Sequence, residues 1–201
     1  MNDTAIITIG PNALGGAYLL RIRVTANQQV RFGCFNGGKP VSLTAGEYSY
    51  LGSALGRGQM PSLGQRVVRH ATRTGEKPPH AIRPALLTYF AAQSLYAGQL
   101  LPKNPKKTFW HIDYLLDCLD TEIGSVYLIH THNPVESALA SFLEAQPEME
   151  IIAKGLGASD DSGHTHLLRV NGAEDWWAGL TKSLVGFRGD LPFGEIENAD
   201  A

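Results

Sequence analysis

The stretch Gly-Ala-Tyr-Leu-Leu-Arg-Ile-Arg-Val, residues 16–24, is the segment from which the fold is most directly deduced. From Leu20 onward, apolar residues at every second position are separated by Arg21 and Arg23. Successive side chains of a β-strand point to opposite faces, so this period of two predicts a half-buried strand.

A second segment with the same period follows further along the chain. Residues 47–52 read Glu-Tyr-Ser-Tyr-Leu-Gly and come directly after a turn at 44–46. A short strand over 30–35 is expected between the two segments, after a polar turn at 27–29. The sequence therefore predicts a three-stranded antiparallel meander, with Tyr18 and Tyr50 on neighbouring strands.

A glycine-containing loop at 53–58 leads into a predicted helix. Pro61 and Ser62 open it, with Ser62 as the expected N-cap. At about 100° per residue the helix has an apolar side and a basic side, with His70 at the border. The apolar side is Leu63, Val67, Val68 and Ala71, and the basic side is Arg66, Arg69 and Arg73.

The rest of the chain alternates helices and strands. Helices are expected over 85–96, from Trp110, and after Pro134, and strands over 124–131 and 166–170. We predict an α/β (α+β) fold with a small, mainly antiparallel central sheet flanked by helices. It comprises residues 1–170 with a helical insertion at about 75–109, and residues 171–201 form a peripheral C-terminal extension rather than a separate domain.

Composition indicates an ordinary soluble protein. The chain has 201 residues, of which 43% are hydrophobic and 18% charged, as in single globular domains. No apolar run approaches the roughly 18 residues that span a bilayer, and the N-terminus does not resemble a secretion signal. We therefore expect a cytoplasmic protein without membrane contact, in which Cys34 and Cys118 are reduced thiols.

The net charge of −2 conceals an uneven distribution along the chain. Residues 57–107 contain nine basic residues and one acid, whereas residues 113–201 contain sixteen acids and four bases. The overall charge argues against a strong non-specific DNA binder, but the basic segment favours a local anionic partner. The alternative is that solvated charges merely cluster in the sequence.

The ordered motifs resemble those of the GIY-YIG nucleases, and more closely the GIY-YIG-like family catalogued as domain of unknown function 123. The resemblance covers about residues 16–170 and rests on the order of its pieces. These are Gly16-Ala17-Tyr18, Gly46-x-Tyr48-x-Tyr50-x-Gly52-Ser53-Ala54, Leu63-x-x-Arg66-x-x-Arg69-His70, Trp110-His111-Ile112-Asp113-Tyr114-Leu115, Glu136, Gly157-Ala158-Ser159-Asp160 and His166-Leu167.

The resemblance implies a nuclease-like site that acts on DNA or RNA phosphodiesters. It implies catalytic roles for Tyr18, Tyr50, Arg66, His70 and Glu136, with nucleic-acid contacts from Ser53, Arg57, Arg69 and Arg73. Two positions depart from the pattern. Many GIY-YIG enzymes have a lysine where this chain has Ser53, and the closer family often has Cys-x-Cys where this chain has Asp161 and Gly163, so no role of those cysteines transfers.

These residue types suit phosphodiester cleavage. A tyrosine base working near pH 7 needs its pKa lowered by roughly 3 units from about 10, which nearby positive charge favours. The planar guanidinium of Arg66 matches phosphate oxygens, and His70 is suited to proton relay. Without such help, Tyr18 and Tyr50 are simply strand aromatics, and Arg66 is a surface ion-pair partner.

A single carboxylate suits one divalent ion, Mg²⁺ or Mn²⁺, which proteins often hold by one or two carboxylates plus waters and substrate phosphates. Glu136 is the expected ligand, unless it is only a first-turn acid favoured by the helix dipole. Asp113 is either a second carboxylate or a cap and buried hydrogen-bond partner.

Two further functions stay open at this stage. One is a non-catalytic nucleic-acid-binding module that keeps the arginine helix. The other is a histidine-ligated metal hydrolase, because His130/His132 and His164/His166 are spaced to share a strand face, near Asp160 and Asp161.

Overall fold

The computed structural model describes residues 5–11, 13–54, 61–93, 100–158 and 163–186. The strands are β1 (Ala5–Ile9), β2 (Gly16–Val24), β3 (Gln28–Val30), β4 (Val41–Leu43), β5 (Gly46–Ala54), β6 (Thr121–His130), β7 (Met149–Glu150) and β8 (Leu167–Val170). The α-helices are α1 (Leu63–His70), α2 (Arg83–Ala91), α3 (His111–Leu116), α4 (Glu136–Glu144) and α5 (Glu174–Gly186), with a 3-10 turn at Phe35–Gly38.

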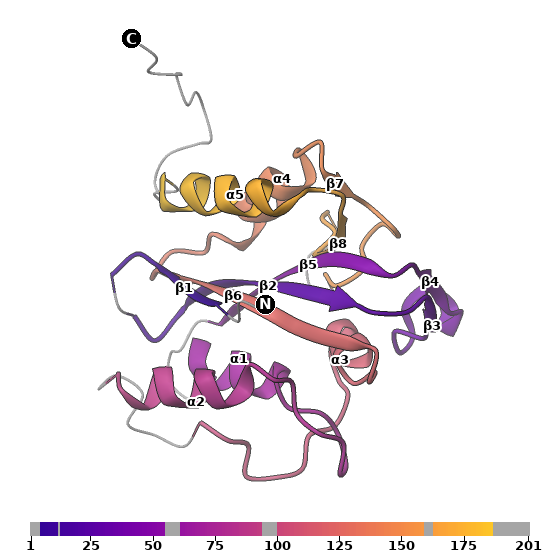
Figure 1. Ribbon diagram of the computed structural model, residues 1–201, viewed down its shortest axis with the longest axis horizontal. Helices are drawn as coiled ribbons and strands as arrows, with labels where there is room; N and C mark the ends of the chain where they lie inside the picture. The colour runs from indigo at the N-terminus through magenta and orange to yellow at the C-terminus, as the bar shows by residue number, and fades with distance from the viewer. Residues whose placement is uncertain (1–4, 12, 55–60, 94–99, 159–162, 187–201) are drawn as a thin grey trace.

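The central sheet has six strands in the order β1-β6-β2-β5-β8-β7. The edge strand β1 runs parallel to β6, and the other neighbours are antiparallel. Helices α4 and α5 cover one face of this sheet, and α1, α2 and α3 lie on the other (Figure 1). The predicted fold class, a mainly antiparallel sheet flanked by helices, is confirmed.

The two tyrosine segments lie on adjacent strands, as the sequence predicted. Strands β2 and β5 pair so that Tyr18 stands opposite Gly52 and Leu20 opposite Tyr50. Cross-strand partners share a face of the sheet, and Tyr18 and Leu20 are two residues apart. Both tyrosines therefore point to the side covered by α1 and α3.

The predicted middle strand of the meander is wrong. Strand β2 pairs directly with β5, and β3 forms a separate two-stranded ribbon with β4. The chain leaves the extended conformation at Gly33, whose φ is +60°, and continues into the 3-10 turn, where Asn36 and Gly37 also have left-handed backbone angles. Strand β1 was not predicted from the sequence, because its short apolar run lacks a clear period.

Two hydrophobic cores lie on the two sides of the sheet. The core beneath α1, α2 and α3 contains Tyr18 and Tyr50 together with buried side chains from those helices. The opposite core contains Leu19 and Leu51 from the same strands and is closed by α4 and α5. Adjacent residues of one strand thus serve opposite cores, which fixes the register of β2 against β5.

Helix α1 begins at the predicted cap but ends before the predicted third arginine. The Ser62 Oγ accepts from the Gln65 backbone nitrogen at 3.3 Å, and the Gln65 Oε1 accepts from the Ser62 nitrogen at 2.9 Å. This reciprocal pair is a capping box. The last helical residue is His70, so Arg73 lies outside the helix and not on its basic side.

The insertion and the C-terminal helix are both built into the cores. In the segment expected as an insertion, Ile82, Leu86 and Phe90 are fully buried in the core beneath α1. In the segment expected to be peripheral, Trp177 and Leu184 of α5 are buried in the opposite core. Residues 171–186 are therefore not peripheral. None of the described helices combines the length and the hydropathy that a bilayer crossing requires.

Gly52 is required where it stands because the ring of Tyr18 crosses it. A Cβ at position 52 would lie 2.4 Å from the Tyr18 Oη and 2.5 Å from its Cζ. Gly52→Ala is expected to lower the free energy of unfolding by about 1–3 kcal/mol, the usual cost of overpacking. Urea unfolding measures this.

The matched control is Gly124→Ala on β6, where a Cβ would make only an ordinary contact at 3.9 Å. Equal loss of stability in the two variants would contradict the packing argument.

Candidate active site

A cluster of rings gathers beneath the β2–β5 pair. The Tyr18 hydroxyl and the His70 Nε2 are 2.7 Å apart and share a hydrogen bond. The ring centroid of Tyr50 lies 6.3 Å from that of Tyr18 and 5.9 Å from that of His70. The ring of Trp110 closes the cluster at 6.0 Å from His70. Strands β2 and β5, helix α1 and the start of α3 thus converge on one point.

Asp113 is the buried anion beside this cluster. Its side chain is fully buried and accepts two hydrogen bonds from the Arg69 guanidinium, at 2.7 and 2.9 Å. The backbone nitrogens of Phe109 and Trp110 also donate to it, at 2.9 and 3.0 Å. It therefore caps the first turn of α3 and pairs with α1, which matches the cap and buried-partner alternative for this residue.

Two more groups face the same carboxylate. The His70 Nδ1 is 3.6 Å from the Asp113 Oδ1, too long for a hydrogen bond but close enough for strong electrostatic contact. The Lys106 Nζ is 3.5 Å from that oxygen and donates to the Thr72 carbonyl at 2.7 Å. Burial by itself would raise the pKa of Asp113, but the groups facing it, His70, Arg69 and Lys106, hold that pKa well below its usual range.

Burial dominates the protonation of the two hydrogen-bonded rings. It lowers the pKa of His70 to about 4, against the opposing effect of Asp113. Burial, and next the neighbouring Tyr50, raise the pKa of Tyr18 well above 10.0, while Arg66 lowers it. At neutral pH both rings are therefore uncharged. Because ionised Asp113 only accepts, the imidazole proton belongs on Nδ1, which leaves Nε2 to accept from the Tyr18 hydroxyl.

The pKa of Tyr18 shifts in the direction opposite to the one expected from the sequence for a tyrosine base. The pKa of Tyr18 had to fall by roughly 3 units for it to act near pH 7, and its burial moves the pKa upward. Among the described residues, Arg66 opposes this rise.

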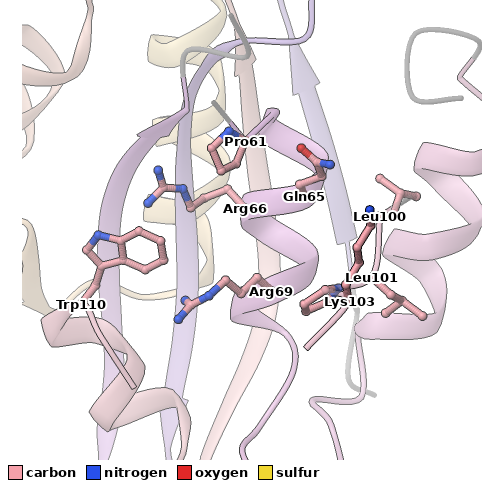
Figure 2. Close-up of a pocket in the computed structure, with 9 residues that line it drawn as sticks. Pro61, Gln65, Arg66, Arg69, Leu100, Leu101, Lys103 and Trp110 are labelled. Carbon is pink, nitrogen blue, oxygen red and sulfur yellow. The ribbon is translucent and has the colours of Figure 1, made fainter. Parts of the chain in front are cut away.

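Arg66 and Arg69 both lie against the indole of Trp110. Their guanidinium carbons are 4.0 and 4.3 Å from the ring centroid, within cation–π range. Figure 2 shows both side chains reaching from α1 toward Trp110. Arg69 is also paired with Asp113, whereas within the described residues no acidic side chain pairs with Arg66. Arg66 is therefore the cation of this cluster that a phosphate can engage.

Glu136 reaches the cluster from the other layer. It is the first residue of α4, and its Oε2 accepts a short hydrogen bond from the Ser53 hydroxyl at the end of β5. Its Oε1 lies 3.5 Å from the His166 Nδ1, and 28% of its side chain is exposed. Its charge is close enough to raise the pKa of Tyr18. The five predicted catalytic residues, Tyr18, Tyr50, Arg66, His70 and Glu136, are thus neighbours in space.

A profile of the family described as "Domain of unknown function DUF123" matches residues 17–186, which is most of the chain. The chain belongs to this family. No curated protein and no solved structure matches it. The family match begins inside β2 and ends with the last described residue of α5, so this DUF123 chain carries the family's sequence pattern across both cores.

The four residues predicted to contact nucleic acid differ in the partners that they have in this structure. Arg57 lies outside the described residues. Ser53 is engaged by Glu136, and Arg69 by Asp113. Arg73 is only 4% exposed and donates to the carbonyls of Leu116, Pro78 and Thr121 and to Glu122. Its donors are used inside the protein, so we correct the expectation that it contacts nucleic acid.

The uneven charge along the sequence is partly cancelled in space. Basic residues of the 57–107 segment pair with acids at the start of the acidic segment. These pairs are Arg69 and Lys106 with Asp113, Arg73 with Glu122, and Lys77 with Asp117. Four of the nine basic residues of the segment are thus engaged in internal ion pairs, so the asymmetry is weaker support for an anionic partner than the sequence suggested.

The histidine-based metal hypothesis finds no support in the described part of the chain. Within it, no group of three or more His, Cys, Asp or Glu side chains is placed to hold a metal ion. The His130 Nδ1 bonds the Ala13 carbonyl, and the His164 Nδ1 lies 3.2 Å from Glu144. Asp160 and Asp161 lie outside the described residues.

Two neighbours of the cluster were not among the predicted catalytic residues. Trp110 contacts both arginines, and His166, considered from the sequence only as a possible metal ligand, lies beside Glu136. Both belong to motif pieces on which the family resemblance rests, and that was the available signal. The motif piece at 157–158 has a structural role, because the Gly157 nitrogen donates to the His111 Nδ1 at 3.3 Å.

The burial of His70 predicts acid sensitivity. Its folded pKa of about 4 lies below the ordinary 6.5, so the unfolded chain binds a proton that the folded chain does not. The contribution of neutral His70 to the free energy of unfolding is present above pH 6.5. It is lost as the pH falls toward 4, which lowers that free energy by at most ~3 kcal/mol. Asp113, whose pKa is also lowered, extends the loss to lower pH.

NMR titration of the His70 imidazole and urea unfolding at several pH values measure the two effects. A His70 that titrates near 6.5 in the folded protein would contradict the burial argument.

Proposed function

We propose that this protein is a divalent-metal-dependent nuclease that hydrolyses phosphodiester bonds in DNA or RNA. The observation that carries the proposal is the convergence of Tyr18, Tyr50, His70, Arg66 and Glu136 from strands β2 and β5 and helices α1 and α4, on both sides of the sheet. Separately, each has an ordinary structural explanation. Together they provide a cation, a carboxylate and a hydrogen-bonded phenol around one point, as phosphodiester hydrolysis requires.

Arg66 is assigned to the phosphate. Its guanidinium carbon lies 4.0 Å from the ring centroid of Trp110, and it has no carboxylate partner within the described residues. A planar fork of this kind matches two phosphate oxygens. A bound phosphate would also give Arg66 the hydrogen bonds that its buried Nε otherwise lacks.

The donors present fit a single Mg²⁺ or Mn²⁺ ion at Glu136. One partly exposed carboxylate, oriented by the Ser53 hydroxyl, is the kind of protein ligand that these ions accept when substrate phosphate and water complete the shell. When bound, such an ion supplies positive charge at the scissile phosphate. Ser53 then acts as the residue that orients Glu136.

The Tyr18–His70 pair is assigned to the proton. The neutral His70 Nε2 accepts from the Tyr18 hydroxyl, and the ionised Asp113 lies on the far side of the ring. If Tyr18 takes a proton from the attacking water, its own proton passes to His70, and Asp113 stabilises the resulting imidazolium. This step becomes favourable only when positive charge at the phosphate offsets the burial that raises the pKa of Tyr18.

The order of the motifs supports the same proposal. The Gly-x-Tyr and Tyr-x-Gly segments on adjacent strands, the arginine helix and the later glutamate resemble the GIY-YIG pattern. Membership of the DUF123 family does not itself assign an activity, and a fold can host several functions. The proposal therefore depends on the site residues.

Cleavage assays on branched, flapped and single-stranded DNA and RNA with Mg²⁺ or Mn²⁺ test the proposal. Glu136→Gln and Tyr18→Phe are each expected to lower the rate roughly 100-fold, since the first removes the proposed metal ligand and the second removes the hydroxyl assigned to the proton transfer. Chelation by EDTA is expected to abolish cleavage.

The matched controls are Glu150→Gln on β7 and Tyr127→Phe on the opposite face of the sheet. Neither touches the cluster, so both should cleave at the wild-type rate. Cleavage that survives both site substitutions would sink the mechanism.

A second function, a nucleic-acid-binding module that does not cleave, is favoured by one observation. Tyr18 and Tyr50 are 1% and 6% exposed, and burial raises the pKa of Tyr18. Buried tyrosine side chains stabilise the fold by packing in the core, with no contribution to catalysis. If this function is correct, no substrate is cleaved with either ion, yet oligonucleotides bind in EDTA and Arg66→Ala weakens that binding.

A further inference from the structure

A pocket of about 480 Å³ opens beside the catalytic cluster. It lies between the exposed side of α1, the segment 100–103 and Trp110 (Figure 2). Tyr18, Tyr50 and Glu136 do not line it, whereas Arg66 does. Arg66 thus belongs to both the pocket and the cluster, so whatever fills the pocket is a direct neighbour of the group that Arg66 binds.

The lining of the pocket combines positive charge, flat surfaces and an apolar wall. Arg66 and Lys103 provide cations, and no described residue that lines the pocket is acidic. The guanidinium groups of Arg66 and Arg69 lie against the indole of Trp110. Leu100 and Leu101 form the apolar side, with Leu101 38% exposed.

This combination suits a nucleotide. A nucleotide has an anionic phosphate for the cations and a flat, largely apolar base, which stacks on aromatic rings and on arginine planes. The volume lies in the range of about 300–1,000 Å³ typical of small-ligand sites. A base that is paired and stacked in a duplex cannot enter such a concave site without being extruded.

We propose that this pocket binds one unpaired nucleotide next to the scissile phosphate, so that the substrate class is nucleic acid with a single-stranded segment at the cleavage point. This inference rests on the proposed function in one respect, that the phosphate beside the pocket is the one that is cleaved. The binding of an unpaired nucleotide in the pocket does not depend on cleavage and is tested without it.

Fluorescence anisotropy in EDTA compares three labelled DNA ligands: a single strand, a duplex, and the same duplex with one unpaired nucleotide. The wild type is expected to bind the single strand and the interrupted duplex at least tenfold more tightly than the intact duplex. Leu101→Glu, which places a negative charge on the exposed wall, is expected to remove that preference.

Val185→Glu is the matched control, because Val185 is 62% exposed on α5, across the sheet from the pocket. Its preference should equal that of the wild type, and both variants should unfold at the wild-type temperature. Free adenosine monophosphate serves as a competitor and should bind far more weakly than the single strand.

The outcomes separate the two proposals. Cleavage with an unchanged preference in Leu101→Glu overturns the pocket and leaves the nuclease intact. A Leu101-dependent preference without cleavage by any metal overturns the nuclease and leaves the pocket intact. Equal wild-type binding of all three ligands, no binding at all, or mononucleotide binding as tight as that of the strand overturns the assignment of the pocket.

Discussion

The buried carboxylate of Asp113 is the constraint on which the rest of the site depends. It accepts hydrogen bonds from Arg69 on α1 and from two backbone nitrogens at the start of α3, and the buried ammonium of Lys106 lies close by. A buried anion is tolerated only when its lone pairs are satisfied in this way. Because Arg69, Lys106 and the two backbone nitrogens all face this one carboxylate, α1, α3 and the 106–110 segment keep one relative position.

That position in turn determines the geometry of the proposed catalytic cluster. Because Arg69 is held by Asp113, His70, the next residue of α1, points beneath the sheet and meets Tyr18. Because the first turn of α3 is capped, Trp110 lies where Arg66 and Arg69 stack on it. The orientation of the only unpaired cation of the cluster, among the described residues, is thus a consequence of a carboxylate that it does not touch.

Fold and proposed activity place opposite demands on Tyr18. Its ring contributes to the core and forces a glycine at position 52, and this burial raises the pKa of the hydroxyl. A reactive phenol needs the opposite shift. Among the described residues, Arg66 lowers the pKa of Tyr18, and the neutral His70 accepts its hydrogen bond. A divalent ion bound at Glu136 would add the positive charge that the proposed reaction needs, against the negative charge of the phosphate.

The sequence by itself determined the two tyrosine-bearing strands, the α1 cap and the order of the motifs, because the strands and the cap depend on local periodicity or local hydrogen bonding. Alternation at residues 20–24 predicted β2, and Pro61-Ser62 predicted the start of α1. The family resemblance added the catalytic set, whose members the structure brings together. The sequence did not distinguish the two alternatives for Asp113.

Only the tertiary structure decided which charges are available. Arg73 looked like part of a basic helix face, yet α1 ends at His70 and the guanidinium turns inward to backbone carbonyls. The basic segment looked like a surface for an anion, yet acids distant in sequence neutralise part of it. Pairing across long sequence separations and the burial that shifts each pKa depend on packing of the whole chain, and no local pattern encodes them.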